Sequence, residues 1–499
     1  MQRKQLTLVI VSLLVVVLSV SLAWFTTQII GKGKNLNVSS ANLQIVFTDS
    51  DGALTETDIE PGWSATKTFT IKNDTKTEYK YNIVIKDLLN TFVTEGYLQY
   101  KITSTNNGYN MTEFKDIPKS SIATDTILAY SVVIPNGVTQ SYTIEFKYAN
   151  DESVDQSIDM NKKLSGTLFI TEGTEQPTFY STLLSDRGIS TTNRTTFSAA
   201  FDSTDQVLYT AKEDNKTVYY FAGNVATNWV KFGKNASNQD LYWRIIRTNS
   251  DDGIRLLYHG TSTTATDAYI GISAFNSTYN NSMYVGYMYG TSGSQASNRT
   301  NTNNSTIKTA IDNWYATNLN TNYGKYISTT AVYCNDREVG SGTYSATGSN
   351  FYYAAFTRLE TNKTPTYTCT NTDDKFTVDS SAGNGKLTYP IALMTADEVS
   401  FAGGLYGANT PTWYYYNSVN GSSTGSKFWW LLSPLDSSTS GSSMFIVRGS
   451  SNPGRLNYNY VYSNNGVRPA LSLKSCVKYS SGDGSASDPY TIKETETGC

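Results

Sequence analysis

Hydrophobic and polar residues alternate with a period of two in several short segments between residues 36 and 172. In the clearest run, residues 79–86, the apolar side chains share one face, and Asn82 lies with two lysines on the other. This period is typical of a strand with one buried face. Turn sequences rich in Pro, Asn and Gly separate the runs. The pattern therefore predicts an all-β, immunoglobulin-like sandwich over residues 36–172.

A second pattern, of short aromatic strands, occupies residues 178–475. Asp252-Gly253 separates two of these strands and is a strong hairpin signal. Two segments follow a helical period instead. One is capped by Ser305 or Thr306, and the other starts with a capping box at 395–398 and should end near Gly403. This mixture predicts an α+β domain.

The N-terminal segment is predicted to direct export. After Arg3 and Lys4, an almost unbroken apolar run extends from residue 6 to residue 30. This run exceeds the roughly 20 residues that a helix needs to cross a bilayer. The small residues around Ala23 also fit a signal-peptidase site. Residues 1–34 are therefore either a transmembrane anchor that leaves the C-terminal domains outside the cell, or a signal that is cleaved on secretion.

Composition excludes two classes of function. The 39 basic and 42 acidic residues give a net charge of −3, which leaves no basic excess for binding nucleic acid. A single histidine, His259, cannot build a multi-histidine metal centre. Asp49, Asp51, Asp58 and Glu60 resemble calcium ligands in type, but they do not form a complete ligand loop. We therefore predict no metal and no cofactor.

The four cysteines favour an oxidising compartment. An even number of cysteines behind an export segment is typical of disulfide-bonded proteins, although four free thiols are an alternative. Proximity in the sequence favours the pairs Cys334–Cys369 and Cys476–Cys499.

Three motifs of the N-terminal region carry a resemblance to a known family. They are Ala23-Trp24-Phe25-Thr26, then Ile59-Glu60-Pro61-Gly62-Trp63, then Lys67-Thr68-Phe69-Thr70-Ile71-Lys72-Asn73. In this order they resemble the camelysin and TasA-like surface proteins of Gram-positive bacteria. The resemblance implies a small sandwich carried onto the cell surface, where some members assemble into fibres. Protease activity is not carried over, because the chain has no His-Glu-x-x-His.

A second resemblance covers residues 215–475. Its landmarks include Trp429-Trp430-Leu431-Leu432-Ser433-Pro434 and Gly466-Val467-Arg468-Pro469-Ala470-Leu471. The series resembles an uncharacterised domain of Firmicutes surface proteins, similar to C-type-lectin-like and formylglycine-generating-enzyme-like folds. The reactive cysteine pair of those enzymes and the calcium triplets of lectins are missing here. Residues 476–499 look like a hairpin tail that closes such proteins.

Aromatic side chains with Arg and Asn nearby are the best ligand-binding candidates, because such surfaces suit sugar rings or peptides. The alternative is that they form ordinary core. No catalytic residue is predicted, because the capping box accounts for Asp397 and Glu398, and His259 should end a hairpin strand. Arg244, Arg247, Arg448 and Arg468 are expected to pair with carboxylates or to bind carbonyls. The predicted ligand-binding residues are Tyr414, Tyr416, Trp429, Trp430, Arg448 and Asn457.

These features together predict a bacterial cell-surface protein that displays a non-catalytic, adhesin-like head on a β-sandwich stalk. Its expected partners are the membrane, through residues 6–30, and a glycan or a host or matrix protein. One alternative is a fibre or matrix subunit that self-associates through the edges of the sandwich. A less favoured alternative is an extracellular enzyme.

Overall fold

The computed structural model describes residues 36–40, 43–49, 54–55, 59–74, 76–265, 268–347, 350–407, 413–415, 428–449 and 452–499. The chain divides into two compact units, Met1–Gln176 and Pro177–Cys499, and each is described by itself. The predicted export helix at residues 6–30 lies outside the described residues. Within these ranges, no helix has both the length and the apolar character needed to cross a membrane.

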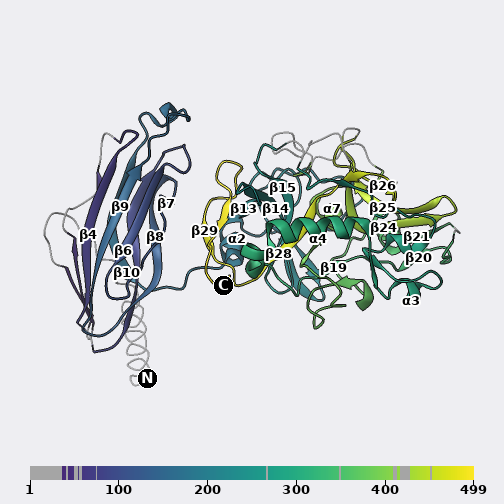
Figure 1. Cartoon of the computed structure of the whole chain (residues 1–499), viewed down its shortest axis with the longest axis horizontal. Helices are drawn as coiled ribbons and strands as arrows, with labels where there is room; N and C mark the ends of the chain where they lie inside the picture. Colours follow the sequence, from purple (N-terminus) through teal and green to yellow (C-terminus); the bar gives the residue numbers. More distant parts are fainter. Residues whose placement is uncertain are drawn as a thin grey trace, which may run out of the picture. The chain divides into compact units, whose positions relative to one another are not determined.

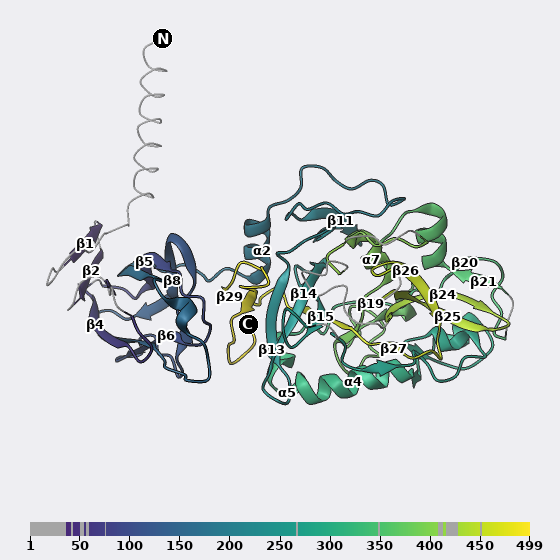
Figure 2. The ribbon, with the colours of Figure 1, turned by 90° about the horizontal axis from the view of Figure 1, so that it is seen from above.

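The first unit contains two antiparallel sheets. One has the strand order β1-β2-β4-β9-β6-β7 and the other the order β3-β10-β5-β8. The longer strands run along a common direction in Figure 1, and the end-on view of Figure 2 separates β5 and β8 from β4 and β6 as two layers. The bounds are β1 Leu36–Ser40, β2 Leu43–Asp49, β3 Leu54–Thr55, β4 Ser64–Asn73, β5 Tyr79–Asn90, β6 Leu98–Ser104, β7 Lys115–Asp116, β8 Ser120–Ile134, β9 Thr139–Tyr148 and β10 Leu164–Glu172, with a 3₁₀ turn at Ser157–Asp159.

The alternating residues of these strands form the core of the first unit, as predicted. Ile83, Ile85 and Ile144 are among its fully buried members. The prediction for Asn82 was wrong, because this residue is also buried. Its amide donates to Glu172 O at 2.9 Å, and its Oδ1 accepts from Ser131 N at 2.9 Å. Asn82 therefore serves as a buried polar link between β5, β8 and the end of β10.

The second unit is α+β and is built on two larger sheets. The first has the order β23-β28-β15-β14-β13-β30-β29, with β11 and β12 joined to its side. The second has the order β16-β27-β24-β21-β20, with β25 and β26 beyond β24. The strands of the first sheet are β11 Tyr209–Glu213, β12 Lys216–Tyr220, β13 Trp229–Lys234, β14 Asp240–Thr248, β15 Ile254–Gly260, β23 Ile391–Leu393, β28 Pro469–Leu473, β29 Tyr479–Ser481 and β30 Tyr490–Ile492. Those of the second are β16 Ile272–Ser273, β20 Val339–Ser341, β21 Phe351–Tyr353, β24 Trp429–Ser438, β25 Gly441–Val447, β26 Leu456–Tyr460 and β27 Asn465–Gly466.

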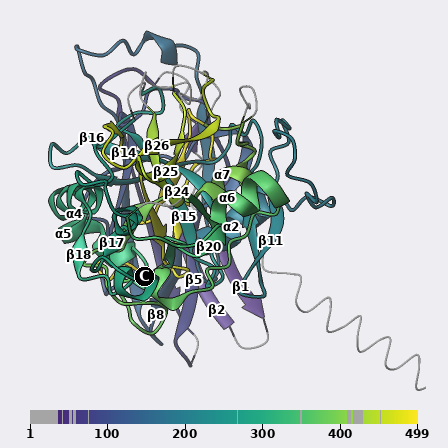
Figure 3. The same ribbon diagram turned by 90° about the vertical axis from the view of Figure 1, so that its right-hand side faces the viewer.

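Short helices cover both sides of these strands. Helices α4 and α5 lie on one side, and α6 and α7 lie on the opposite side (Figure 2 and Figure 3). The helices are α2 Phe179–Arg187, α3 Gln295–Asn298, α4 Thr306–Asn318, α5 Asn320–Tyr323, α6 Ala354–Phe356 and α7 Ala396–Ala402. The shorter turns are Ser282–Val285, Gly324–Tyr326, Thr357–Asn362 and Thr372–Asp374, and the two-stranded ribbons pair β17 Met288–Tyr289 with β18 Asn303–Asn304 and β19 Tyr333–Cys334 with β22 Lys375–Phe376.

Local sequence signals set several boundaries in this unit. Ser305 caps α4, and the predicted capping box of Thr395 and Glu398 is confirmed at the start of α7, which ends at Gly403. Gly403 has a φ of 119°, a conformation that favours glycine. The hairpin of β14 and β15 at Asp252-Gly253 is also confirmed.

Both predicted disulfides, Cys334–Cys369 and Cys476–Cys499, are confirmed. The C-terminal tail does form a hairpin, β29–β30, but it is not separate from the second unit. Tyr490 of β30 lies beside Val230 of β13 in parallel register, so the tail extends the first sheet.

Candidate functional site

Three of the predicted ligand-binding residues lie in the core of the second unit. Tyr414 and Trp430 are fully buried, and Trp429 is 4% exposed. Trp430 donates its indole N–H to Ser273 O at 2.8 Å, and Trp429 packs against Tyr415. An exposed platform made of these three rings was therefore a wrong prediction. The physical reason is that large apolar side chains in a sheet stabilise the fold most when they are buried.

The other three predicted residues are placed differently. Arg448 is partly buried, with its guanidinium 5.2 Å from the centre of the Phe428 ring. Asn457 is partly buried on β26, beside Ile446 of β25. Tyr416 lies outside the described residues. Of the six, Asn457 is the one that the structure places next to an exposed aromatic surface.

Four tyrosines from two distant segments form this surface, which we call the tyrosine patch: Tyr279, Tyr458, Tyr460 and Tyr462. The rings of Tyr279 and Tyr462 are 4.6 Å apart, and those of Tyr460 and Tyr462 are stacked at 5.6 Å. Tyr279, Tyr458 and Tyr462 are 46%, 42% and 44% exposed. The patch therefore presents large aromatic faces to solvent at the β26 edge of the second sheet.

The turn after β26 holds the patch in place. Asn459 accepts a hydrogen bond from Ser463 Oγ at 2.9 Å and donates one to Asn465 Oδ1 at 3.3 Å. Both bonds close the turn that carries Tyr462. Burial and the neighbouring Tyr458 and Asp436 raise the pKa of Tyr460, so its hydroxyl stays neutral at physiological pH. The result is an aromatic surface whose supporting turn is fixed by side-chain hydrogen bonds.

Part of the patch has a signal in the sequence that the predicted ligand-binding residues do not include. Tyrosine recurs at every second position from 458 to 462, which is the period of one strand face; Tyr458 and Tyr460 lie on β26, and Tyr462 lies in the turn that follows. Tyr279 could not be found this way, because it lies far away in the sequence and joins the patch only through the fold.

Ion pairs restrain the carboxylates in the interior of the second unit. Arg247 contacts Glu213 at 2.8 Å and Glu398 at 3.0 Å, and Arg255 contacts Glu398 at 2.7 Å. Asp397 is held by Arg358 at 2.9 Å. Burial raises the pKa of Glu213, but Arg247 more than offsets it, so the net pKa is lowered. Arg247 thus favours the ionised form of Glu213, which does not suit a general acid, and Asp397 and Glu398 are also held by arginine.

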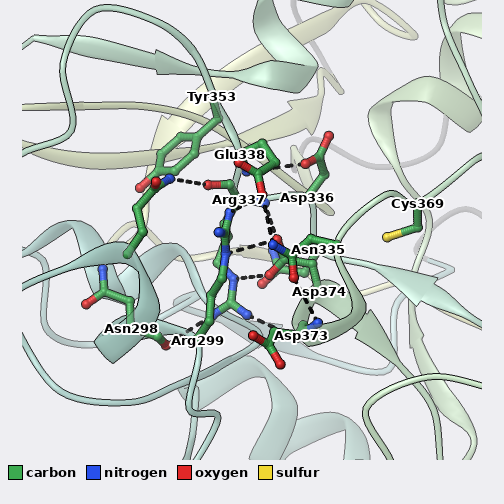
Figure 4. A network of polar contacts seen from close by, with 12 residues as sticks. Asn298, Arg299, Asn335, Asp336, Arg337, Glu338, Tyr353, Cys369, Asp373 and Asp374 are labelled. Carbon is green, nitrogen blue, oxygen red and sulfur yellow. Dashed lines mark hydrogen bonds and ion pairs between the residues drawn. The ribbon is translucent and has the colours of Figure 1, made fainter.

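A second network surrounds the segment between β19 and β20 (Figure 4). Arg337 donates to Asp374 Oδ1 at 2.6 Å from its side chain and to Asp374 Oδ2 at 2.9 Å from its backbone. Arg299 contacts Asp374 at 3.3 Å and Glu338 at 3.2 Å. Asn335 donates to Leu432 O at 2.8 Å. These bonds fix three chain segments around β24, so the network is a structural support.

His259 is the penultimate residue of β15, which ends at Gly260, one position later than predicted, and its side chain is fully buried. Its ring lies 4.4 Å from that of Trp229 and 5.8 Å from that of Tyr415. Burial, with the nearby Arg468 and Arg244, lowers its pKa well below the usual value. The imidazole is therefore neutral in the folded protein.

Comparison with known families places one match inside the second unit. Residues 264–475 match a family described as a domain of unknown function (DUF6273). No curated protein matches the chain. The matched segment contains the tyrosine patch, the network around Arg337 and half of the residues named in the first network. The resemblances to camelysin and TasA-like proteins and to C-type-lectin-like domains remain predictions.

Proposed function

We propose that the protein is a bacterial cell-surface protein whose second unit is a non-catalytic, adhesin-like binding head and whose first unit is its stalk. The observation that carries this proposal is the tyrosine patch. Tyrosine offers a large, rigid contact area at a low cost in conformational entropy, and Asn, Ser and Gly offer adaptable hydrogen bonds. The turn after Tyr460 contains two of these residues, Ser463 and Asn464.

The interior of the second unit supports binding rather than catalysis. Asp397 and Glu398, the carboxylates that would suit glycoside hydrolysis, are each paired with arginine. The two disulfides support an extracellular setting, because such bonds persist in oxidising compartments. The proposal retains the export segment at residues 6–30 as either an anchor or a cleaved signal.

A screen of the full chain, purified in mild detergent, against arrayed glycans and host-matrix proteins tests this function. The proposal expects reproducible, saturable binding to one ligand class, with the protein remaining unassembled in sedimentation. A folded chain that binds no ligand on either array would contradict it.

A specific observation favours one second candidate, a fibre or matrix subunit. Strand β8 is the last strand of its sheet in the described part of the first unit, and Ile122 on it is 73% exposed. Exposed strand edges can pair with another chain. Ordered filaments without any ligand binding would support this candidate in place of the adhesin-like head.

A further inference from the structure

A cleft of about 200 Å³ opens in the second unit and shares no residue with the tyrosine patch. Its walls come from the turn between β14 and β15, the loop before β19 and the segment around Cys369. Pockets for drug-sized ligands usually measure about 300–1,000 Å³. The cleft therefore has room for a single small unit, such as one sugar residue.

The side-chain amide of Asn249 lines this cleft and makes no hydrogen bond to any residue that the structure describes. Asn249 is 7% exposed, and both its Oδ1 and its Nδ2 are buried without a partner. The turn does not depend on this side chain, because the backbone N–H of Asn249 donates to Gly253 O at 2.8 Å. An unpartnered buried amide costs about 1–3 kcal/mol. A ligand that pairs with both atoms would recover this free energy.

The hydroxyl of Tyr367 is a second unpartnered group on the wall of the cleft. Its ring stacks on Phe401 at 4.0 Å, and the guanidinium of Arg247 lies 4.5 Å from the ring centre. Burial raises the pKa of Tyr367 well above the usual value, so the hydroxyl can both donate and accept a hydrogen bond.

The charged groups of the cleft largely have partners in the protein. Glu213 pairs with Arg247 and also accepts from Ser250 N at 2.7 Å. Asp214 lies 3.7 Å from Lys375. The remaining wall includes short apolar side chains, those of Ala331, Val332 and Ala382. The cleft thus combines a neutral amide, a neutral hydroxyl and a methyl-sized apolar wall.

We infer that this cleft binds the acetamido group of an N-acetylated sugar. The acetamido carbonyl oxygen would accept from Asn249 Nδ2, a ring hydroxyl of the sugar would donate to Asn249 Oδ1, and the acetyl methyl group would pack against Ala331 and Ala382. A sugar hydroxyl would pair with Tyr367. The inference adds a second ligand site to the proposed head, and it can be tested independently of the tyrosine patch.

Titration of the full chain with N-acetylglucosamine, followed by saturation-transfer NMR, tests the inference, with glucose as the comparison because it lacks the acetamido group. We expect N-acetylglucosamine to bind at least tenfold more tightly than glucose. Asn249→Ala should weaken binding at least tenfold and Tyr367→Phe severalfold, whereas Tyr490→Phe, a buried tyrosine outside the cleft, should have no effect. Unchanged circular dichroism would show that the variants fold.

The inference is overturned if N-acetylglucosamine does not bind, or if it binds the Asn249→Ala variant equally well. Failure of the proposed function looks different, because array binding that Tyr462→Ala leaves unchanged would contradict the tyrosine patch, while N-acetylglucosamine would still bind and Asn249→Ala would still weaken that binding. Two further probes identify the source of the N-acetylated sugar. Binding is compared between a bacterial-wall disaccharide of N-acetylglucosamine and N-acetylmuramic acid and a glycan that ends in N-acetylglucosamine. Preference for either supports the acetamido site, and binding of neither contradicts it.

Discussion

Removal of the Cys334–Cys369 disulfide should destabilise the second unit strongly. The bond joins residues 35 positions apart, and it ties β19 to the loop that carries Tyr367. The loop-entropy relation gives about 4 kcal/mol for a closed loop of this length. Cys369 is 4% exposed, so alanine is the appropriate replacement at both positions. We therefore expect Cys334→Ala with Cys369→Ala to lower the free energy of unfolding of this unit by about 4 kcal/mol.

Urea denaturation followed by tryptophan fluorescence is the assay. Six of the eight tryptophans lie in the second unit, from Trp229 to Trp430, so the fluorescence change reports mainly on its unfolding. With a urea slope of about 3 kcal/mol per molar, the midpoint should fall by more than 1 M. The matched comparison is the Cys476–Cys499 pair, which closes a shorter loop with a separation of 23 residues. A loss below about 1 kcal/mol for the Cys334→Ala and Cys369→Ala variant would show that this disulfide does not stabilise the second unit as expected.

Three further predictions concern buried polar groups. Arg337→Met leaves Asp374 without its closest ion pair, so urea denaturation should show a loss of about 3–5 kcal/mol, and an unchanged midpoint would contradict it. Asn82→Ala removes the polar link in the first unit and should cost about 2–3 kcal/mol by calorimetry; a loss below 0.5 kcal/mol would argue against that link. The pKa of His259 is lowered in the folded protein. When the pH falls below the ordinary value of 6.5, the unfolded state therefore takes up a proton on His259 before the folded state does. Stability should therefore fall as the pH drops below about 6.5, by up to about 1.4 kcal/mol per pH unit, and His259→Phe should remove that slope.

Local features of the fold were accessible from the sequence because they depend on neighbouring residues. Alternation in residues 79–86 marked β5, and Thr395 with Glu398 marked the start of α7. Asn82 shows the limit of this approach. Its burial depends on partners at the ends of β8 and β10, which the period of two does not reveal.

The candidate site was less accessible because it is assembled from distant segments. Tryptophan occurs both in exposed binding platforms and in buried cores, so the residue type alone does not place Trp429 and Trp430. Only the packing of the sheet shows that they are buried. Tyr279 meets Tyr462 across the fold. The sequence also does not show that the side chains of Asn249 and Tyr367 lack hydrogen-bond partners, because this depends on which groups surround them in the folded protein.

The most direct test of the binding head is a comparison of array binding by the unmodified chain with that by two variants. Tyr279→Ala with Tyr462→Ala removes the contacting pair at 4.6 Å, and Tyr352→Ala removes an exposed tyrosine outside the patch. We expect the first variant to lose at least tenfold in apparent affinity and the second to bind like the unmodified chain. Equal binding by all three proteins would contradict the assignment of the tyrosine patch as the ligand surface.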